Sequence, residues 1–459
     1  MKILSRICVA VFLVAAVFAP VSLVAQDDAE DVLKDIAKDK DDLDDVRSEA
    51  LKTLRVMEVV DVALYGDLSL DGGDKRRVRL EAVRNLALCP ADDATVKAAL
   101  KTLATSTQEE ACLRVEAIRA AGKLDIDTVG VRAELRQMAV SADENLRVRS
   151  IAIGVLCEDL DTGTIGDLVG VLVNGEQEVR IRISVLTGMR ESDDAGYLGA
   201  VKELIATTQP ESGLNGGLLG AENSVARIRI IAIGVAEKHL DDSAIVAAVK
   251  VLAADKTEGT CARDMAIRLL GNFQTETSSI ETLTGIVDNA TDSEDMRIAA
   301  MRAVSKSRAP ESYALVVKYL KDKTAPEKLR HIAVALLANG IPGTRTGAFG
   351  EMVAESEAWS DVAGAVGKLE EVARDTTDEK SFRLRVIRCV CGSTNSHAQG
   401  MFRGLASDKG LDKDIRICAI RSILLDSEGY SALMARVNDA EEDEDVKAAA
   451  LKALGDTVA

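Results

Sequence analysis

One pattern returns along almost the whole of this 459-residue chain. Residues 146–156 read LRVRSIAIGVL and residues 226–236 read ARIRIIAIGVA, each with two arginines inside an apolar run. With the first residue of each copy as position zero, related segments begin at Val46, Val78, Leu113, Leu146, Ile181, Ala226, Ala262, Met296, Leu329, Phe382, Ile415 and Val446. Most intervals are 31 to 36 residues long, and two are 45 and 53. A fixed period of about 20 to 50 residues is the signature of a solenoid or an array.

Each copy has the spacing of an amphipathic helix. Position zero and position five are apolar in every copy, and position four is most often Ala. Residues at these spacings share one face of an α-helix. A second segment of the same kind precedes the copies across a turn, for example at residues 94–103, 243–252 and 313–320. One helix pair cannot bury its apolar faces alone, so we predict an all-α fold, an α-solenoid of about twelve helix–turn–helix repeats over residues 26–459.

Two insertions interrupt the period. Residues 208–225 are rich in Gly and Asn and fall between the paired helices of one repeat. Residues 340–360 contain GIPGTRTGAFG and Trp359 and fall between repeats. Insertions in solenoids often carry contacts, and they are equally well tolerated as surface excursions. The sequence leaves both interpretations open.

The repeats resemble a known family. An acid followed by Val-Arg-x-x-Ala-x-x-Ala/Leu-Gly is similar to HEAT repeats, closest to the short HEAT-like type first seen in phycobilin lyases. The resemblance extends over about residues 29–455. It implies a right-handed superhelix whose concave side is lined by the second helix of each pair and binds other proteins. It also raises lyase activity as an alternative, which fits poorly with an exported chain.

The N-terminus has the form of a secretory signal peptide. Lys2 and Arg6 precede an apolar run, and Ala25 ends the segment before an acidic stretch. We therefore predict a signal peptide over residues 1–25, with cleavage after Ala25 and a periplasmic or secreted location. The alternative is an uncleaved membrane anchor, because residues 7–25 are almost long enough to span a bilayer.

Charge limits the partners. The formal net charge is −18, which disfavours nucleic acid because phosphate recognition needs clustered cations. Aromatic residues make up 3% of the chain, so stacking platforms for sugars or bases are not expected. Protein partners fit this composition better than a small-molecule substrate.

Position one carries a column of basic residues. At about 100° per residue it lies within the apolar sector, so these side chains should point at neighbouring repeats. An acid three or four residues before position zero can cap the helix and meet an arginine one turn on. We interpret the column as a structural ladder, made of Arg47, Arg79, Arg114, Arg147, Arg182, Arg227, Arg263, Arg297, Arg330, Arg383 and Arg416, with Lys447 in the last copy.

A second basic set lies at position six, away from the apolar stripe. It comprises Lys52, Arg84, Arg119, Arg268, Arg302, Arg388, Arg421 and Lys452. Among the copies that lack it, those that begin at Leu146 and Ala226 have Arg149 and Arg229 at position three, which we expect to face outward. These residues form either a solvated face paired with nearby acids or a basic strip that holds an acidic peptide or protein surface.

Motifs for catalysis are absent from the sequence. His239, His331 and His397 lie far apart, so we expect no metal site, and no cofactor motif is present. The cysteines suit small buried core positions, although an exported protein could form disulfides. The pairs Cys89–Cys112 and Cys389–Cys418 join consecutive repeats and are the bridges that the sequence allows.

The sequence therefore favours a non-catalytic interaction scaffold outside the cytoplasm. Its partner would bind the concave second-helix face. The alternative is a structural or assembly component of an envelope complex, in which the acidic ends at residues 27–45 and 441–445 cap the array. A lyase-type or accessory enzyme subunit is the third hypothesis.

Overall fold

The computed structural model describes residues 23–207, 223–273, 277–307, 309–339, 341 and 361–455. Most of the predicted signal peptide and nearly all of both insertions lie outside these ranges. Every regular element within them is a helix. None of these helices has both the length and the apolar character needed to cross a bilayer.

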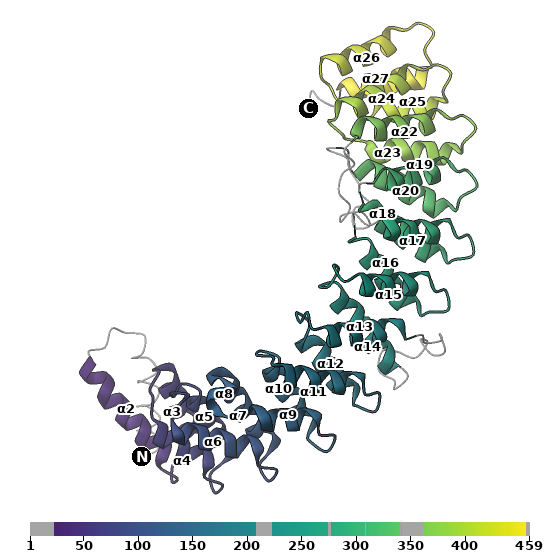
Figure 1. Ribbon diagram of the computed structural model, residues 1–459. Coiled ribbons are helices and arrows are strands. Elements are labelled where there is room, and N and C mark those ends of the chain that lie inside the picture. Colours follow the sequence, from purple (N-terminus) through teal and green to yellow (C-terminus); the bar gives the residue numbers. More distant parts are fainter. Residues whose placement is uncertain are drawn as a thin grey trace. The chain divides into compact units, whose positions relative to one another are not determined.

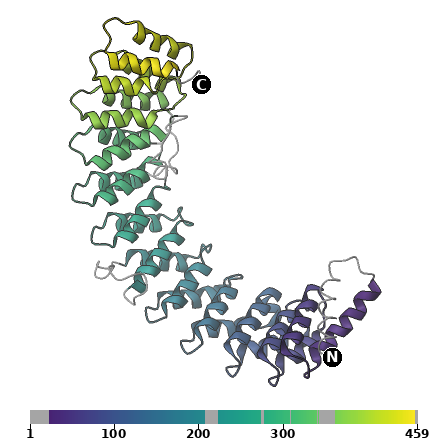
Figure 2. The ribbon, with the colours of Figure 1, turned by 180° about the vertical axis from the view of Figure 1, so that it is seen from behind.

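The chain divides into two compact units, residues 1–201 and 202–459. In each unit, helix pairs follow one another in sequence order, and each pair contacts the next (Figures 1 and 2). The first unit contains α2 (Leu23–Lys38), α3 (Asp44–Val56), α4 (Val62–Leu70), α5 (Arg76–Leu86), α6 (Ala94–Thr105), α7 (Ala111–Leu124), the short α8 (Ile126–Val129), α9 (Arg132–Val140), α10 (Leu146–Leu156), α11 (Thr162–Val173) and α12 (Val179–Gly188). α13 (Ala195–Ala206) lies at the boundary.

The second unit continues the same organisation. It contains α14 (Asn223–Ala236), α15 (Ser243–Ala254), α16 (Thr260–Leu270), α17 (Thr277–Asp288), α18 (Glu294–Ser305), α19 (Pro310–Lys321), α20 (Glu327–Asn339), α22 (Val362–Arg374), α23 (Lys380–Val390), α24 (Ser396–Ser407), α25 (Lys413–Ile420), α26 (Ser427–Asn438) and α27 (Glu444–Gly455). The predicted all-α solenoid fold is confirmed.

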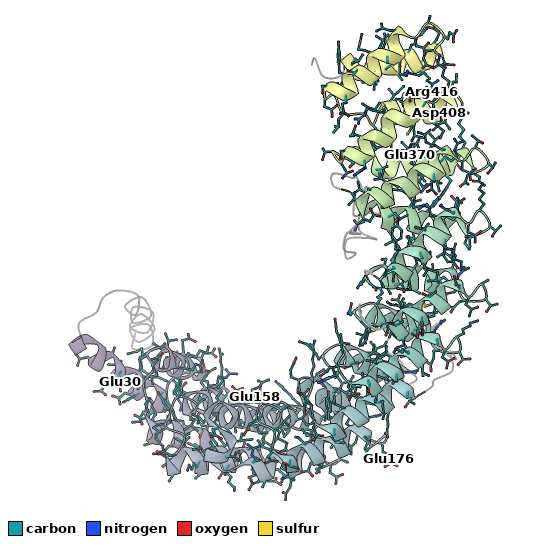
Figure 3. The ribbon with its side chains drawn as sticks, turned by 45° about the horizontal axis from the view of Figure 1, so that its top comes forward. Glu30, Glu158, Glu176, Glu370, Asp408 and Arg416 are labelled. Atoms are coloured by element: carbon teal, nitrogen blue, oxygen red, sulfur yellow. The ribbon has the colours of Figure 1, made fainter. Side chains whose placement is uncertain are left out.

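The core of each unit is a continuous apolar layer between helices. The second helices contact one another in order, α3, α5, α7, α10 and α12 in the first unit, and α16, α18, α20, α23, α25 and α27 in the second. Their position-five side chains, such as Leu51, Ile267 and Val334, are fully buried. Exposed carboxylates such as Glu158 and Glu176 lie on the surface (Figure 3).

Local sequence sets where the helices begin and how each pair turns. Several first helices start at an Asp cap; the Asp93 and Asp242 carboxylates, for example, accept backbone N–H bonds from the first turn. Between the two helices, an Asp or Asn such as Asp255 accepts the N–H two residues on with its side chain and the N–H three residues on with its carbonyl. This Asx turn fixes the place of its fourth residue in every repeat that has it.

The register predicted for two repeats is wrong by two residues. Leu146, taken as position zero, is 39% exposed, whereas Val148 is fully buried, and Ile228 is likewise buried in the other copy. Most second helices begin two residues before position zero, as α5 does before Val78. By the same spacing, α10 has Val148 at position zero. The segments L-R-V-R and A-R-I-R offer the same alternation twice, so the sequence pattern alone could not choose between them.

Candidate functional site

The position-one arginines tie the two helices of each repeat together. The Nε atom of Arg47 donates to the carbonyl of Ala37, ten residues earlier at the end of α2, at 3.0 Å. The same bond to the residue ten positions back recurs at Arg79, Arg114, Arg149, Arg182, Arg263, Arg297, Arg383 and Arg416. In Arg330 the donor is Nη2. Arg229 reaches Ile205, 24 residues back, because the first insertion lengthens that turn.

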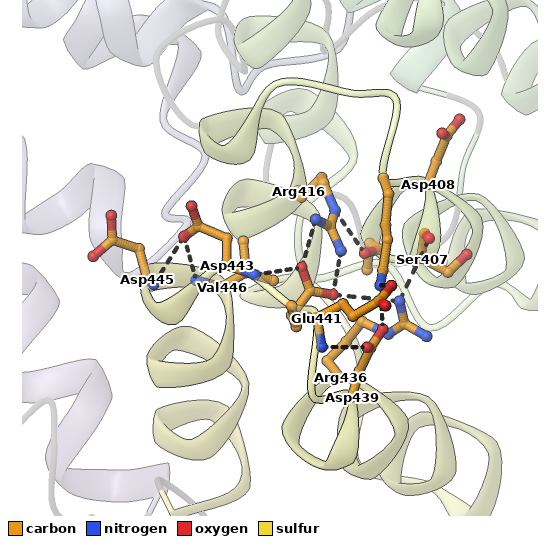
Figure 4. Close-up of polar contacts among 12 residues, drawn as sticks. Ser407, Asp408, Arg416, Arg436, Asp439, Glu441, Asp443, Asp445 and Val446 are labelled. Atoms are coloured by element: carbon orange, nitrogen blue, oxygen red, sulfur yellow. Dashed lines mark hydrogen bonds and ion pairs between the residues drawn. The ribbon is translucent and has the colours of Figure 1, made fainter.

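The other edge of the guanidinium binds the next repeat. Nη1 and Nη2 of Arg47 donate to both oxygens of Asp74, at 2.7 and 2.6 Å. Asp74 is the fourth residue of the following Asx turn. Equivalent bonds join Arg79 to Glu109, Arg114 to Glu144, Arg149 to Gln177, Arg229 to Glu258, Arg263 to Asp292, Arg330 to Asp378 and Arg416 to Glu442. Figure 4 shows Arg416 beside the turn that contains Asp439 and Glu441. We call such an arginine with its bonds a rung. Each rung connects the first helix of a repeat, the second helix of the same repeat and the turn of the next repeat.

Two sequence expectations about the ladder need correction. The acids bind the arginine of the preceding repeat and not the one in their own helix. In α10 and α14, the buried rungs are Arg149 and Arg229, which we expected to face outward, whereas Arg147 and Arg227 are exposed. The two-residue register error explains the exchange. Since both rung arginines are buried and bonded, neither can contact a partner.

Some rungs lack an acid. The turn residue opposite Arg383 is Leu411, and the Arg383 Nη2 atom has no hydrogen-bond partner. Opposite Arg297 the turn residue is Ala325, and the Tyr319 hydroxyl lies 3.3 Å from Arg297 Nη2 instead. The rung opposite Arg182 falls at the first insertion, outside the described ranges. These exceptions show that the backbone turn forms without the ion pair.

In the first unit, the position-six cations are neutralised by acids at position three. Arg84 binds Glu81 at 2.6 Å and Glu116 at 3.0 Å. Arg119 lies 3.8 Å from Glu116, and Arg55 also binds Glu81. Hydrogen bonding to Glu116 raises the pKa of Arg84 despite partial burial, which keeps the ion pair formed. Lys52 pairs in the same way with Glu49 in α3. Arg84, Arg119 and Lys52 thus form a salt-bridged face.

In the second unit, the same positions face a different neighbourhood. Position three is Met265 in α16, Ala299 in α18, Ile332 in α20, Arg385 in α23 and Cys418 in α25. Arg268 pairs with Asp264 on its own helix. Arg302 has a buried Nε atom without a partner, and burial together with the nearby Arg268 charge lowers its pKa. Among the described residues, no carboxylate forms an ion pair with Arg302, Arg388 or Arg421. We call these three residues the basic strip.

Contacts along second helices order the basic strip. Arg302 belongs to α18, Arg388 to α23, and Arg421 follows α25 as its C-terminal cap. α18 contacts α20, α20 contacts α23, and α23 contacts α25, so the three cations come from neighbouring second helices. The corresponding residue of α20 between them is Ala335, which is buried. Arg388 also lies beside the Cys418 thiol, whose pKa is raised by burial. Lys452 of α27 continues the row and is exposed.

The cysteines and histidines form no reactive cluster in the part of the chain that the structure describes. Cys89, Cys112, Cys389 and Cys418 are free thiols, so neither allowed disulfide is present. The Cys89 thiol, in the turn after α5, contacts the carbonyl of Asn85, and Cys112 contacts Glu110. Within these ranges, no group of His, Cys, Asp and Glu could hold a metal ion. His331 stacks on Phe382 and burial lowers its pKa, which favours the neutral ring.

Comparison with known proteins gives no family and no function. No protein-family model matches the chain, and no curated protein matches it. Among solved structures it is similar to a Kap121p mutant, at 12% identity over 93% of this chain and 49% of that one, with a TM-score of 0.47. Kap121p bound to RanGTP is 14% identical over 93% of this chain and 48% of that one, with a TM-score of 0.46. Human deoxyhypusine hydroxylase in complex with glycerol is 16% identical over 69% of this chain and 98% of that one, with a TM-score of 0.25. The chain spans about half the length of the Kap121p structures.

Proposed function

We propose that the chain is a non-catalytic scaffold that binds an acidic segment of a partner protein along the basic strip of its second unit. The observation that carries the proposal is the contrast at position three. Glu49, Glu81 and Glu116 neutralise the cations of α3, α5 and α7, whereas position three is Ala299 in α18 and Cys418 in α25, and no described carboxylate pairs with the cations beside them. In a chain of net charge −18, such a row recognises carboxylates by complementarity.

The compartment is proposed from the first residues alone. The basic start and apolar run that end at Ala25 support export with cleavage after this residue, to the periplasm or the medium. Cell fractionation followed by N-terminal sequencing of the purified chain tests this. A first residue of Gln26 in an extracytoplasmic fraction supports export, whereas recovery of the intact N-terminus in the membrane fraction supports the anchor.

A binding measurement tests the strip directly. A fluorescent poly-glutamate peptide is titrated against the full chain at low and moderate salt, with anisotropy as the readout. The variant Arg302→Gln, Arg388→Gln and Arg421→Gln should bind at least tenfold more weakly than the unmodified chain. The affinity should also fall with salt, because the interaction is electrostatic.

The first unit supplies a matched control. Lys52→Gln, Arg84→Gln and Arg119→Gln remove the same number of charges from the same helical position, but from a face that is already paired. We expect this variant to bind like the unmodified chain. Equal loss in both triple variants would show that binding follows net charge and would contradict the strip. Affinity purification from the native envelope fraction then identifies the partner.

The assembly-component alternative makes a different prediction. If the chain only joins an envelope complex through other surfaces, partners recovered with the unmodified chain and with the strip variant should be the same. Loss of one acidic protein from the strip variant alone supports the scaffold.

A further inference from the structure

The last described repeat exposes a side chain that every other repeat buries. At position five, with the corrected register, the side chains from Leu51 to Ile420 are at most 1% exposed. Leu451 occupies the same position in α27 and is 56% exposed. Tyr430 of α26 is 55% exposed, whereas Gln399, the corresponding residue of α24, is buried. The Gln399 amide donates to the carbonyl of Ser422, in the loop that leads from α25 to the following repeat. Both exposed residues therefore face the place where a further repeat would pack.

The ladder position of α27 is also incomplete. Lys447 stands where the other repeats have a buried arginine. Its ammonium pairs at 3.2 Å with Glu444 on its own helix, and its side chain is 20% exposed. In the preceding repeat, Arg416 binds Glu442 of the next turn and its side chain is 5% exposed. We call Tyr430, Lys447 and Leu451 the tail face.

The first described repeat has the complementary features. Val32 of α2 is 42% exposed, whereas Leu64, at the same distance from its arginine-bound carbonyl in α4, is buried. Val46 is partly exposed, whereas position zero is fully buried in Val78. The fourth residue of the first Asx turn is an acid, Asp42. We call Val32, Asp42 and Val46 the head face.

We infer that the tail face of one molecule packs against the head face of a second copy. This contact would repeat the packing between neighbouring repeats within the chain. There, the following helix pair covers position five of each second helix, and the position-one cation lies opposite the fourth residue of the following turn. Leu451 is then covered by α2 and α3 of the second copy, and Lys447 faces the turn that contains Asp42. A head-to-tail contact uses two different surfaces, so it extends into a chain of molecules unless the geometry closes a ring.

Sedimentation velocity of the full chain over a wide concentration range tests the inference. The unmodified chain should increase in mass with concentration. Leu451→Glu blocks the tail face and Val32→Glu blocks the head face, and each variant alone should remain a monomer. An equimolar mixture of the two retains one working tail and one working head, and should form dimers and nothing larger. Both substitutions are at exposed positions, and circular dichroism checks that the variants fold.

The control places the same change away from either end. Val251→Glu introduces a charge at a 67% exposed valine of α15, and this variant should associate like the unmodified chain. A chain that stays monomeric at about 100 µM, where a contact with a micromolar Kd would be populated, overturns the inference. A dimer that survives Val32→Glu but not Leu451→Glu overturns it in favour of a tail-to-tail contact.

Discussion

Two adjacent repeats of the second unit have a buried arginine at the same position, but the turn residue opposite this arginine differs. Arg416 of α25 meets Glu442, with Nη1 to Oε1 at 2.6 Å, whereas Arg383 of α23 meets Leu411 and keeps Nη2 without a partner. Both arginines hold the same carbonyl bond, from Nε to Ala406 and to Ala373. The turn backbone is also the same in both. The bond within the repeat and the apolar contacts are therefore common to both, and the acid adds an optional link between repeats.

Removing the acid from the complete rung should have the largest effect. Glu442→Leu gives the Arg416 rung the same turn residue as the Arg383 rung. It leaves the buried Arg416 guanidinium without its counter-charge and also removes the contact of Glu442 with Arg436 at 3.4 Å. Breaking a buried pair in this way costs about 3 to 5 kcal/mol of unfolding free energy. Urea unfolding measures the loss, and native-state hydrogen exchange should place it in α24 to α27. Glu441→Leu, at the exposed neighbouring residue, is the control and should change stability by less than about 0.5 kcal/mol.

Supplying an acid to the incomplete rung is the reverse experiment. Leu411→Glu places a carboxylate opposite the unpaired Arg383 Nη2 but removes a buried apolar side chain. The two effects offset each other, so a double-mutant cycle with Arg383→Met isolates the pair. We expect a coupling energy of about 1.5 to 3 kcal/mol in favour of the new pair, the range for hydrogen bonds to charged groups. A coupling near zero would mean that the rung geometry depends on more than the turn residue.

Acid should weaken the complete rung and leave the incomplete one unchanged. Burial raises the pKa of Glu442, but the hydrogen bonds from Arg416 and the Asp443 backbone outweigh it, so the pKa lies below the usual value for Glu. A depressed carboxyl pKa contributes stability above the unfolded-state pKa and loses it as pH falls through the folded-state pKa. Stability should therefore fall below about pH 4.5, the ordinary pKa of Glu, and Glu442→Leu should reduce this slope. An unchanged slope would assign the acid sensitivity to other carboxylates, such as Glu144 or Asp292, whose pKa values are also lowered.

The sequence predicted the fold well because its periodicity reports burial directly. Position five is apolar wherever a repeat covers it, so a solenoid follows from spacing alone. The register of α10 did not follow, since Leu146 and Val148 both precede an arginine. The difference lies in where the helix begins, which the Asn145 cap fixes by accepting from the N–H groups of Arg147 and Val148.

The candidate site was only partly predictable for a related reason. Position six identified Arg84 and Arg302 alike, because helix geometry places both on the outer face. Whether such a cation is neutralised depends on acids of the neighbouring helix, as with Glu116 for Arg84, and therefore on contacts between repeats. Position three carries that signal in the sequence, but its meaning becomes clear only when the packing order of the second helices is known.

A third kind of rung provides the smallest expected effect. The turn residue opposite Arg297 is Ala325. The Tyr319 hydroxyl accepts a hydrogen bond from Arg297 Nη2 and donates to the carbonyl of Val287 at 2.9 Å. Tyr319→Phe removes these contacts together with the one from the hydroxyl to Asp288 Oδ1 at 2.9 Å, and it keeps the ring. It should cost about 1.5 kcal/mol, the lower end of the range for hydrogen bonds to charged groups. The loss is smaller than in Glu442→Leu because Arg297 retains its bond from Nε to Val287 and loses no counter-charge. Urea unfolding and exchange protection in α17 to α20 give the measurement. A cost equal to that of Glu442→Leu would show that a neutral hydroxyl can replace the carboxylate in full, and that the charge itself adds little to the link between repeats.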